Sequence, residues 1–347
     1  MKKYFISDSG KAYKANLHTH TTASDGNFTP EEIKRIYKEK GYSVVAFTDH
    51  EKLYGRQNLT DDEFLALNGY ELEMMRDGDR PYALTPSLHL LMIAKTPEVK
   101  KHVAFDSNYC RWSGVPGEEI ALIDHDSDQI RELNEEWFQR AVTEANAAGY
   151  LVSLCHPEWS LITSEDYRHI EGLWGVEVFN NACYTAGILE NTLHYTDLLR
   201  QGEYVHALAT DDTHSAGHVG GGYVVIKAEK LDYPSIIQSL VNGNFYASTG
   251  VEIQSCYIED DEVHVCCSPA KAIRLYHGAR KGSIVQWKNG EVVQGARDGA
   301  VVKSVNDGGI TEAVFKVKPE YKQYLRIQIA GVDEDSDAWT NPIWLDL

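Results

Sequence analysis

The sequence predicts an α/β domain followed by a smaller β-rich domain. Between about Lys11 and Gly250, short apolar runs alternate with segments of helical periodicity, which is typical of α/β folds. After Gly250, apolar segments are separated by turn residues such as Asn289-Gly290, a pattern typical of a small β-sandwich. Because a chain of 347 residues has room for about two domains, we expect one over residues 1–250 and a second over 251–347.

The first strand–helix–strand unit illustrates how the residues specify each element. Residues 13–18 are expected to form a strand, and residues 29–32 (Thr-Pro-Glu-Glu) begin a helix. There the threonine is the expected N-cap, the proline is the first helical residue, and the second glutamate completes a capping box. Gly41 ends the helix, and the apolar run 42–47 predicts a strand buried on both faces.

The remaining elements follow from the same patterns. The sequence predicts further strands at 88–94, 150–154, 176–179 and 205–209, helices at 132–148 and 191–200, and tail strands at 273–276, 313–317 and 324–329. Residues 95–128 break this regularity with Pro97, Pro116, several glycines and mixed charges. We interpret them as a long insertion and a candidate lid over the functional site.

Charge and cysteine content limit the partners and the location of the protein. The 33 Lys and Arg residues against 52 Asp and Glu residues give a net charge of −19, which disfavours long nucleic acid and anionic membrane surfaces. The six cysteines form no Cys-x-x-Cys pair and are expected to be buried thiols of a reducing compartment. No segment has the apolar length of a signal peptide or a membrane span, so we expect a cytoplasmic protein. The negative charge favours a small-molecule substrate over long nucleic acid. The sequence leaves the oligomeric state open.

Most polar residues that could carry chemistry stand where a predicted strand ends. They are His18, His20, Asp25, Asp49, His50, His156, Asp212 and His214, and Glu71 lies in the segment Gly69-Tyr70-Glu71-Leu72. Because the carboxyl ends of parallel strands in a barrel converge on one face, we expect these side chains to meet in one pocket.

Imidazoles and carboxylates without a thiolate favour Zn, Mn or Fe(II) as the bound ion. His18 and His20 are two positions apart on a strand, so both rings can point to the same ion. A carboxylate such as Glu71 can bridge two ions, which together acidify a shared water. The sequence contains no Gly-x-Ser-x-Gly elbow, so a serine nucleophile is not indicated.

The chain also resembles a known family. Its segments 16–26 (Asn-Leu-His-Thr-His-Thr-Thr-Ala-Ser-Asp-Gly), 47–50 (Phe-Thr-Asp-His), 69–71 (Gly-Tyr-Glu), 155–157 (Cys-His-Pro) and 212–214 (Asp-Thr-His) are similar, in order and spacing, to the successive motifs of the PHP (polymerase and histidinol phosphatase) superfamily. The tail lies outside the resemblance and looks like an extra β domain found in some members. The resemblance implies a distorted (βα)7 barrel in front of that domain.

The resemblance also implies two or three divalent metal ions and a role for each motif residue. One ion would be held by His18, His20, Glu71 and Asp212. A second would be held by Glu71, His89 and His156, and a third by Asp25, His50 and His214. Many members with three ions carry a histidine where this chain carries Asp25. Asp49 is expected to orient an imidazole from outside the ligand set, and Glu177 stands at a strand position that is commonly glutamate in the family.

These observations together predict a PHP-type metal-dependent phosphoesterase. A metal-bound hydroxide would attack phosphorus in a small phosphorylated metabolite or a short nucleotide. His50, Asp212 and His214 are the expected catalytic residues, and His214, His50 or a water would protonate the leaving oxygen. No residue can be assigned to substrate binding.

The sequence is compatible with two alternative functions. The same ions could hydrolyse a carboxylic ester, a carbamate or an amide, because the arginines that could bind phosphate are scattered: Arg56, Arg80, Arg131 and Arg140. The chain could also be a non-catalytic binding module in which the barrel no longer reacts.

Overall fold

The computed structural model describes residues 2–76, 78, 80–280, 282–294, 299–306, 308–317 and 323–345. The helices are α1 (Pro30–Glu39), α2 (Ser107–Trp112), α3 (Gly117–Ile120), α4 (Glu135–Ala148), α5 (Ser164–Tyr167), α6 (Asn181–Thr185), α7 (Leu193–Gln201) and α8 (Tyr233–Val241). The first ten strands are β1 (Lys3–Ile6), β2 (Lys11–Asn16), β3 (Val44–Phe47), β4 (Leu65–Met75), β5 (Ser87–Ala94), β6 (Tyr150–Leu154), β7 (Gly175–Asn180), β8 (His206–Thr210), β9 (Tyr223–Ala228) and β10 (Phe245–Ser248). The remaining strands are β11 (Ile253–Glu259), β12 (Glu262–Tyr276), β13 (Gly282–Lys288), β14 (Glu291–Gln294), β15 (Val301–Asn306), β16 (Gly309–Lys316), β17 (Tyr324–Gly331), β18 (Asp337–Thr340) and β19 (Ile343–Trp344).

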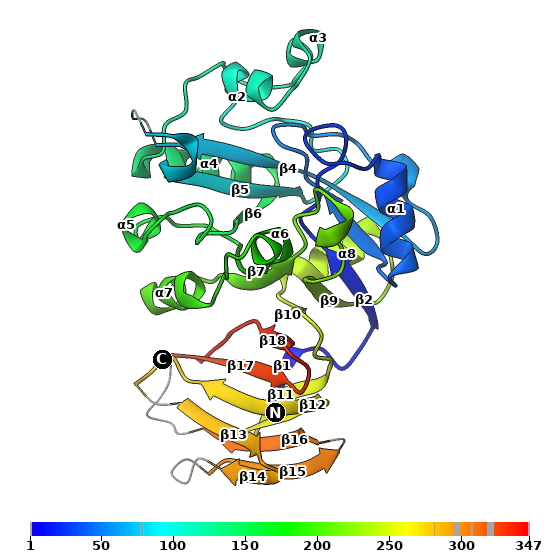
Figure 1. Ribbon diagram of the computed structural model, residues 1–347, viewed down its shortest axis with the longest axis vertical. Helices are drawn as coiled ribbons and strands as arrows, with labels where there is room; N and C mark the ends of the chain where they lie inside the picture. Colours follow the sequence, from blue (N-terminus) through cyan, green and yellow to red (C-terminus); the bar gives the residue numbers. More distant parts are fainter. Residues whose placement is uncertain are drawn as a thin grey trace.

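The first part of the chain is a mixed α/β structure. Parallel pairs join β2 to β3, β3 to β4, β6 to β7 and β7 to β8. β9 runs antiparallel to both β2 and β10, and β8 lies against β9. In Figure 1, α1 covers one side of these strands, and α4, α5 and α7 lie on the other. No helix among the described residues combines the length and the apolar character needed to cross a bilayer.

The pairing of β4, β5 and β6 corrects one expectation. The sequence pattern predicts mostly parallel strands, but β5 runs antiparallel to both β4 and β6. Only the short segment 76–86 connects β4 to β5, which leaves no room for a crossover helix, so the chain turns straight back.

Local residues begin and end the helices as the sequence predicts. Thr29 caps α1, and Glu32 completes the capping box. Gly41 follows this helix with a φ of 79°, a left-handed conformation that suits glycine. α4 begins three residues later than predicted, because Asn134 accepts a hydrogen bond from the Trp137 amide as its N-cap.

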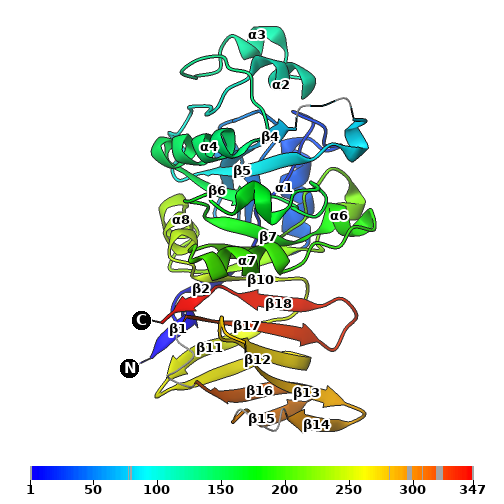
Figure 2. The same cartoon turned by 90° about the vertical axis from the view of Figure 1, so that its left-hand side faces the viewer.

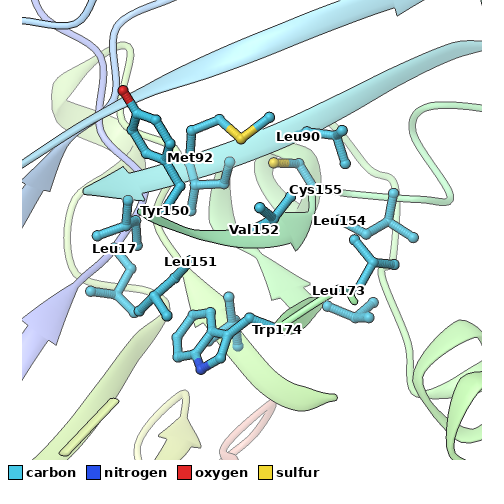
Figure 3. Close-up of a cluster of buried hydrophobic side chains, with 14 of the residues drawn as sticks. Leu17, Leu90, Met92, Tyr150, Leu151, Val152, Leu154, Cys155, Leu173 and Trp174 are labelled. Carbon is cyan, nitrogen blue, oxygen red and sulfur yellow. The ribbon is translucent and has the colours of Figure 1, made fainter. Parts of the chain in front are cut away.

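The strands of the first part pack around an apolar core. Leu90 and Met92 of β5 are fully buried, and Val152 and Leu154 lie beside them on β6 (Figure 3). This core fixes the strands from which the functional side chains project.

The second part of the chain is wholly antiparallel in its described pairings. β12 pairs with β11, β13, β16 and β17, and the Asn289-Gly290 turn joins β13 to β14 with both residues at positive φ, as the sequence predicts. β10 pairs with β9 on one side and β18 on the other, so it connects the two parts. β1 pairs with β11, which places the first strand in the second part. Figures 1 and 2 show this part at the opposite end of the molecule from α2 and α3.

Candidate metal centre

The structure brings the predicted site residues together from most strands of the first part. Four strands are followed by site residues: β2 by His18, His20 and Asp25, β3 by Asp49 and His50, β6 by His156, and β8 by Asp212 and His214. Three strands contain one each: Glu71 in β4, His89 in β5 and Glu177 in β7. Two of these residues adopt positive φ values without being glycine, 22° at His156 and 49° at Asp212. Such conformations are strained, and strain of this kind concentrates at functional sites.

Four buried side chains converge on one point. His18 Nε2 lies 3.3 Å from Glu71 Oε2 and 3.3 Å from Asp212 Oδ1. His20 Nε2 lies 3.2 Å and 3.1 Å from the same two oxygens. Asp212 Oδ1 is buried but accepts no hydrogen bond from the residues that the structure describes. Unpaired lone pairs that face each other at these distances suit four ligands of one cation, so these residues fit a divalent ion.

A second group shares Glu71 with the first. Glu71 Oε1 lies 2.8 Å from His89 Nδ1 and 3.1 Å from His156 Nε2. The other nitrogen of His89 lies 3.3 Å from Glu73 Oε1. Because the two oxygens of Glu71 face two different sets of imidazoles, this carboxylate has the position of a bridge between two ions.

The third group is more open. Asp25 Oδ2 lies 3.3 Å from His214 Nε2 and 3.7 Å from His50 Nε2. The side chain of Asp25 is 54% exposed, whereas that of Glu71 is 1% exposed. His20 joins this group through Nδ1, which lies 3.5 Å from Asp25 Oδ1. Fewer buried donors and greater exposure predict weaker cation binding here than at the first group.

Glu177 fixes the orientation of the first imidazole. Its Oε1 lies 2.8 Å from His18 Nδ1 and accepts a hydrogen bond from Thr210, and its Oε2 accepts one from the His156 amide. Asn180 donates both to Glu177 and to Asp212. A proton held on His18 Nδ1 by Glu177 would leave the lone pair of Nε2 free for an ion.

Asp49 contacts a loop instead of the imidazole beside it. Its carboxylate accepts hydrogen bonds from the Thr21 amide and hydroxyl, from Ser24 and from Arg56. Ser24 in turn lies 3.4 Å from His20 Nδ1. Within the described part of the chain, the Asp49 carboxylate therefore reaches an imidazole through Ser24 of the 21–24 loop.

The charges of the site strongly perturb one another. Burial lowers the pKa of His20, but the adjacent carboxylates of Asp212 and Glu71 outweigh this effect and raise the pKa to about 10. Burial raises the pKa of Glu71, yet the surrounding imidazoles hold it well below its usual value. Burial also lowers the pKa of His50. Since carboxylates of this site stay ionised, they retain the charge that attracts a cation.

The three groups open into a cavity of about 480 Å³. Its wall includes Tyr82, Trp159 and, from the 95–128 insertion, Trp112, Ser113 and Gly114. Of the lining residues that the structure describes, none is a lysine or an arginine. Anionic groups of a substrate would therefore depend on bound cations and imidazoles for charge compensation.

Several residues of the site were not predicted from the sequence. Glu73, Trp159 and Cys183 line the cavity, and Cys155 lies within ligand distance of His18 and His156. Burial raises the pKa of the Cys155 thiol well above its usual value, so it remains protonated. A signal did exist for Glu73, because it stands two positions after Glu71 and thus points to the same side of a strand.

No family model and no curated protein matches the sequence. The structure is similar to a two-domain protein from Bacteroides vulgatus described as containing a predicted PHP-like metal-dependent phosphoesterase, with 12% identity, a TM-score of 0.44 and coverage of 97% of this chain and 96% of that chain. It is also similar to a lesion-specific endonuclease from Pyrococcus furiosus (15% identity, TM-score 0.40, coverage 67% and 56%). A third similar structure is a protein from Bifidobacterium adolescentis described as a putative metal-dependent phosphoesterase (17% identity, TM-score 0.38, coverage 60% and 90%). At these identities and TM-scores, the similarities by themselves assign no function to the chain.

Proposed function

We propose that the protein is a PHP-type metal-dependent hydrolase, and specifically a phosphoesterase. The observation that carries the proposal is the convergence of His18, His20, Glu71 and Asp212 on one buried point, where an Asp212 oxygen lacks a donor. Glu71 extends the set toward His89 and His156, so the donors suit more than one ion. Zn, Mn and Fe(II) match a set of imidazoles and carboxylates.

The chain's own residues would orient and protonate the substrate. Bound divalent ions would supply a water acidic enough to react at neutral pH and would offset charge on the phosphoryl group. Glu177 would keep His18 in its binding tautomer, and Asn180 would hold Asp212 through its other oxygen. His50 and His214 border the cavity, where either is placed to give a proton to the leaving oxygen.

The size and charge of the cavity support a small substrate. A volume of about 480 Å³ suits a metabolite or a short nucleotide, and the net charge of −19 repels long polyanions. We also propose that the first part is a distorted (βα)7 barrel, because the late strand β9 pairs with the early strand β2. The second part would be a β-sandwich, because its described strand pairs are antiparallel.

One observation favours a second candidate function. A cavity without described lysines or arginines suits a neutral ester, carbamate or amide as well as a phosphoester. The same ions would then polarise a carbonyl group instead of a phosphoryl group.

A substrate panel distinguishes these functions. Purified protein with added Mn²⁺ would be assayed against phosphomonoesters, phosphodiesters, aryl esters and carbamates. We expect phosphoester turnover that requires the ion and is lost in His18→Ala but kept in His169→Ala, which removes an exposed imidazole. Absence of any turnover that depends on both Mn²⁺ and His18 would contradict the proposal, and faster turnover of aryl esters would favour the second candidate.

A further inference from the structure

A second cavity, of about 430 Å³, lies between the segment that follows His50 and the 95–128 insertion. Its lining consists of Lys52, Leu53, Tyr54, Gly55, Lys100, His102, Val115, Glu119, Leu122, Ile123 and Asp124. None of these described residues also lines the metal-centre cavity. The volume falls within the range of small-molecule sites in proteins.

Lys52 is the unusual residue of this wall. It is only 8% exposed, yet no carboxylate, carbonyl or hydroxyl of the described chain accepts a hydrogen bond from its ammonium group. The ring centroid of Tyr54 lies 5.9 Å from Nζ, at the outer limit of a cation–π contact, and an uncharged ring does not neutralise the ammonium group. An ammonium group that borders a cavity and has no carboxylate partner among the described residues can be neutralised by an anion inside that cavity.

The rest of the wall is mainly apolar. Leu53, Val115, Leu122 and Ile123 contribute aliphatic surface, and Leu122 is 84% exposed. An exposed leucine at the edge of a cavity offers surface that a hydrophobic ligand can cover. The ligand that fits these residues has one anionic end and an aliphatic body.

The other charges of the wall limit how negative that end can be. Glu119 is already engaged by the Tyr54 hydroxyl at 2.6 Å, and Asp124 and Lys100 are exposed. Two carboxylates near the cavity disfavour a doubly charged phosphate more than a single carboxylate. The buried lysine therefore matches a monoanion.

We propose that this cavity binds a small aliphatic carboxylate, whose oxygens accept hydrogen bonds from Lys52 Nζ. The ligand would lie between the 52–55 loop and the insertion, and it would contact both. The same insertion contributes Trp112, Ser113 and Gly114 to the metal-centre cavity. The 95–128 insertion therefore forms part of the wall of both cavities, although no described residue lines both.

Calorimetric titration of the full chain with octanoate tests the proposal, with octanol as the uncharged analogue. We expect saturable binding of octanoate, weaker binding of octanol, and a rise in melting temperature with octanoate concentration. Lys52→Met keeps the aliphatic stem but removes the charge, and we expect it to weaken octanoate binding by at least about 10-fold. Lys100→Met removes an exposed charge from the same wall, and its effect should stay below about 3-fold.

A second variant keeps the test decisive if Lys52→Met does not fold. Leu122→Asp changes an exposed side chain and places a negative charge at the cavity, so it should weaken octanoate binding without lowering the melting temperature. Equal affinity for octanoate and octanol, equal affinity of the wild type and Lys52→Met, or no saturable heat at millimolar octanoate would each overturn the proposal.

Discussion

Glu177 is a buried residue that contacts the proposed metal ligands without belonging to them. Its two oxygens contact His18, Thr210, Asn180 and the amide of His156. His18 and His156 are candidate ligands themselves, Asn180 also donates to Asp212, and Thr210 stands two positions before Asp212 in the sequence. The family resemblance pointed to its position, but only the contacts explain why a carboxylate is needed there.

Replacing Glu177 with glutamine tests this role. Glu177→Gln removes the charge that holds a proton on His18 Nδ1, and we expect metal affinity to fall by about 10- to 100-fold. Competitive titration with a chromogenic chelator measures the change. Glu229→Gln removes an exposed charge and should leave the affinity unaltered; equal affinities for the two variants would contradict the tautomer argument.

Glu190 predicts a pH dependence of stability. Burial raises its pKa to about 7 from an ordinary value of 4.5, although the amides of Glu158 and Trp159 donate to it. Between these two pH values the folded protein keeps a proton that the unfolded chain has released. Raising the pH across this interval should therefore lower the free energy of unfolding, by at most about 3 kcal/mol, with no further loss above it.

Urea unfolding at several pH values, with a chelator present, measures this effect. Glu190→Gln cannot ionise, so its free energy of unfolding should change less than that of the wild type between pH 4.5 and 7. Parallel pH profiles for the two proteins would exclude a raised pKa at Glu190.

At the scale of elements, locally determined features were predictable and long-range ones were not. The N-cap of α1 follows from Thr29 and its neighbours, and the strand β6 follows from its apolar run. β4 was missed because polar Asn68, Glu71 and Glu73 interrupt an otherwise apolar strand, and their burial depends on partners elsewhere in the chain. The candidate site was predictable as a set of motif residues that included Glu177, whereas the partners of Glu177, Thr210 and Asn180, were not predicted.

The anchoring of the insertion is one of these long-range features. Arg131 follows the insertion and lies 2.7 Å from Glu51 Oε1, from which it is separated by 80 positions, and both side chains are fully buried. Glu51 also accepts a hydrogen bond from the Glu73 amide, so this ion pair links the end of the insertion to β4.

Breaking the pair should therefore destabilise the protein. Arg131→Leu removes the guanidinium from the buried Glu51 carboxylate and leaves it with the His102 imidazole and the Glu73 amide as neighbours. We expect a loss of about 3–5 kcal/mol in the free energy of unfolding, measured in urea. Adding Glu51→Gln should restore part of the loss. Arg140→Leu breaks an exposed pair with Glu144 and should cost less than about 1 kcal/mol; similar losses for both arginine variants would show that the buried pair is no anchor.

At the scale of the whole molecule, the two parts of the chain meet at β10 and at the C-terminal segment. The Asn341 side chain accepts a hydrogen bond from the Ala207 amide and donates to the carbonyls of Gly243 and Phe245. These hydrogen bonds connect the segment after β18 to β8 and to the start of β10. Because β10 also pairs with strands of both parts, we expect the two parts to unfold together.

Asn341→Ala tests the coupling of the two parts. It removes all three hydrogen bonds at a buried position, and we expect a loss of about 2–4 kcal/mol and a separation of one calorimetric transition into two. Asn242→Ala changes an exposed asparagine and should keep a single transition. One unchanged transition in Asn341→Ala would place the coupling elsewhere.

The claim that unites these scales is that imidazoles and carboxylates from most strands of the first part jointly bind cations. Elemental analysis of protein purified without chelators tests it most directly, in the wild type and in Asp212→Asn. The account predicts two or three ions of Zn, Mn or Fe per wild-type chain and a reduced content in the folded variant. A folded wild-type protein that holds no divalent metal, and takes up none when Zn²⁺ or Mn²⁺ is added, would contradict it.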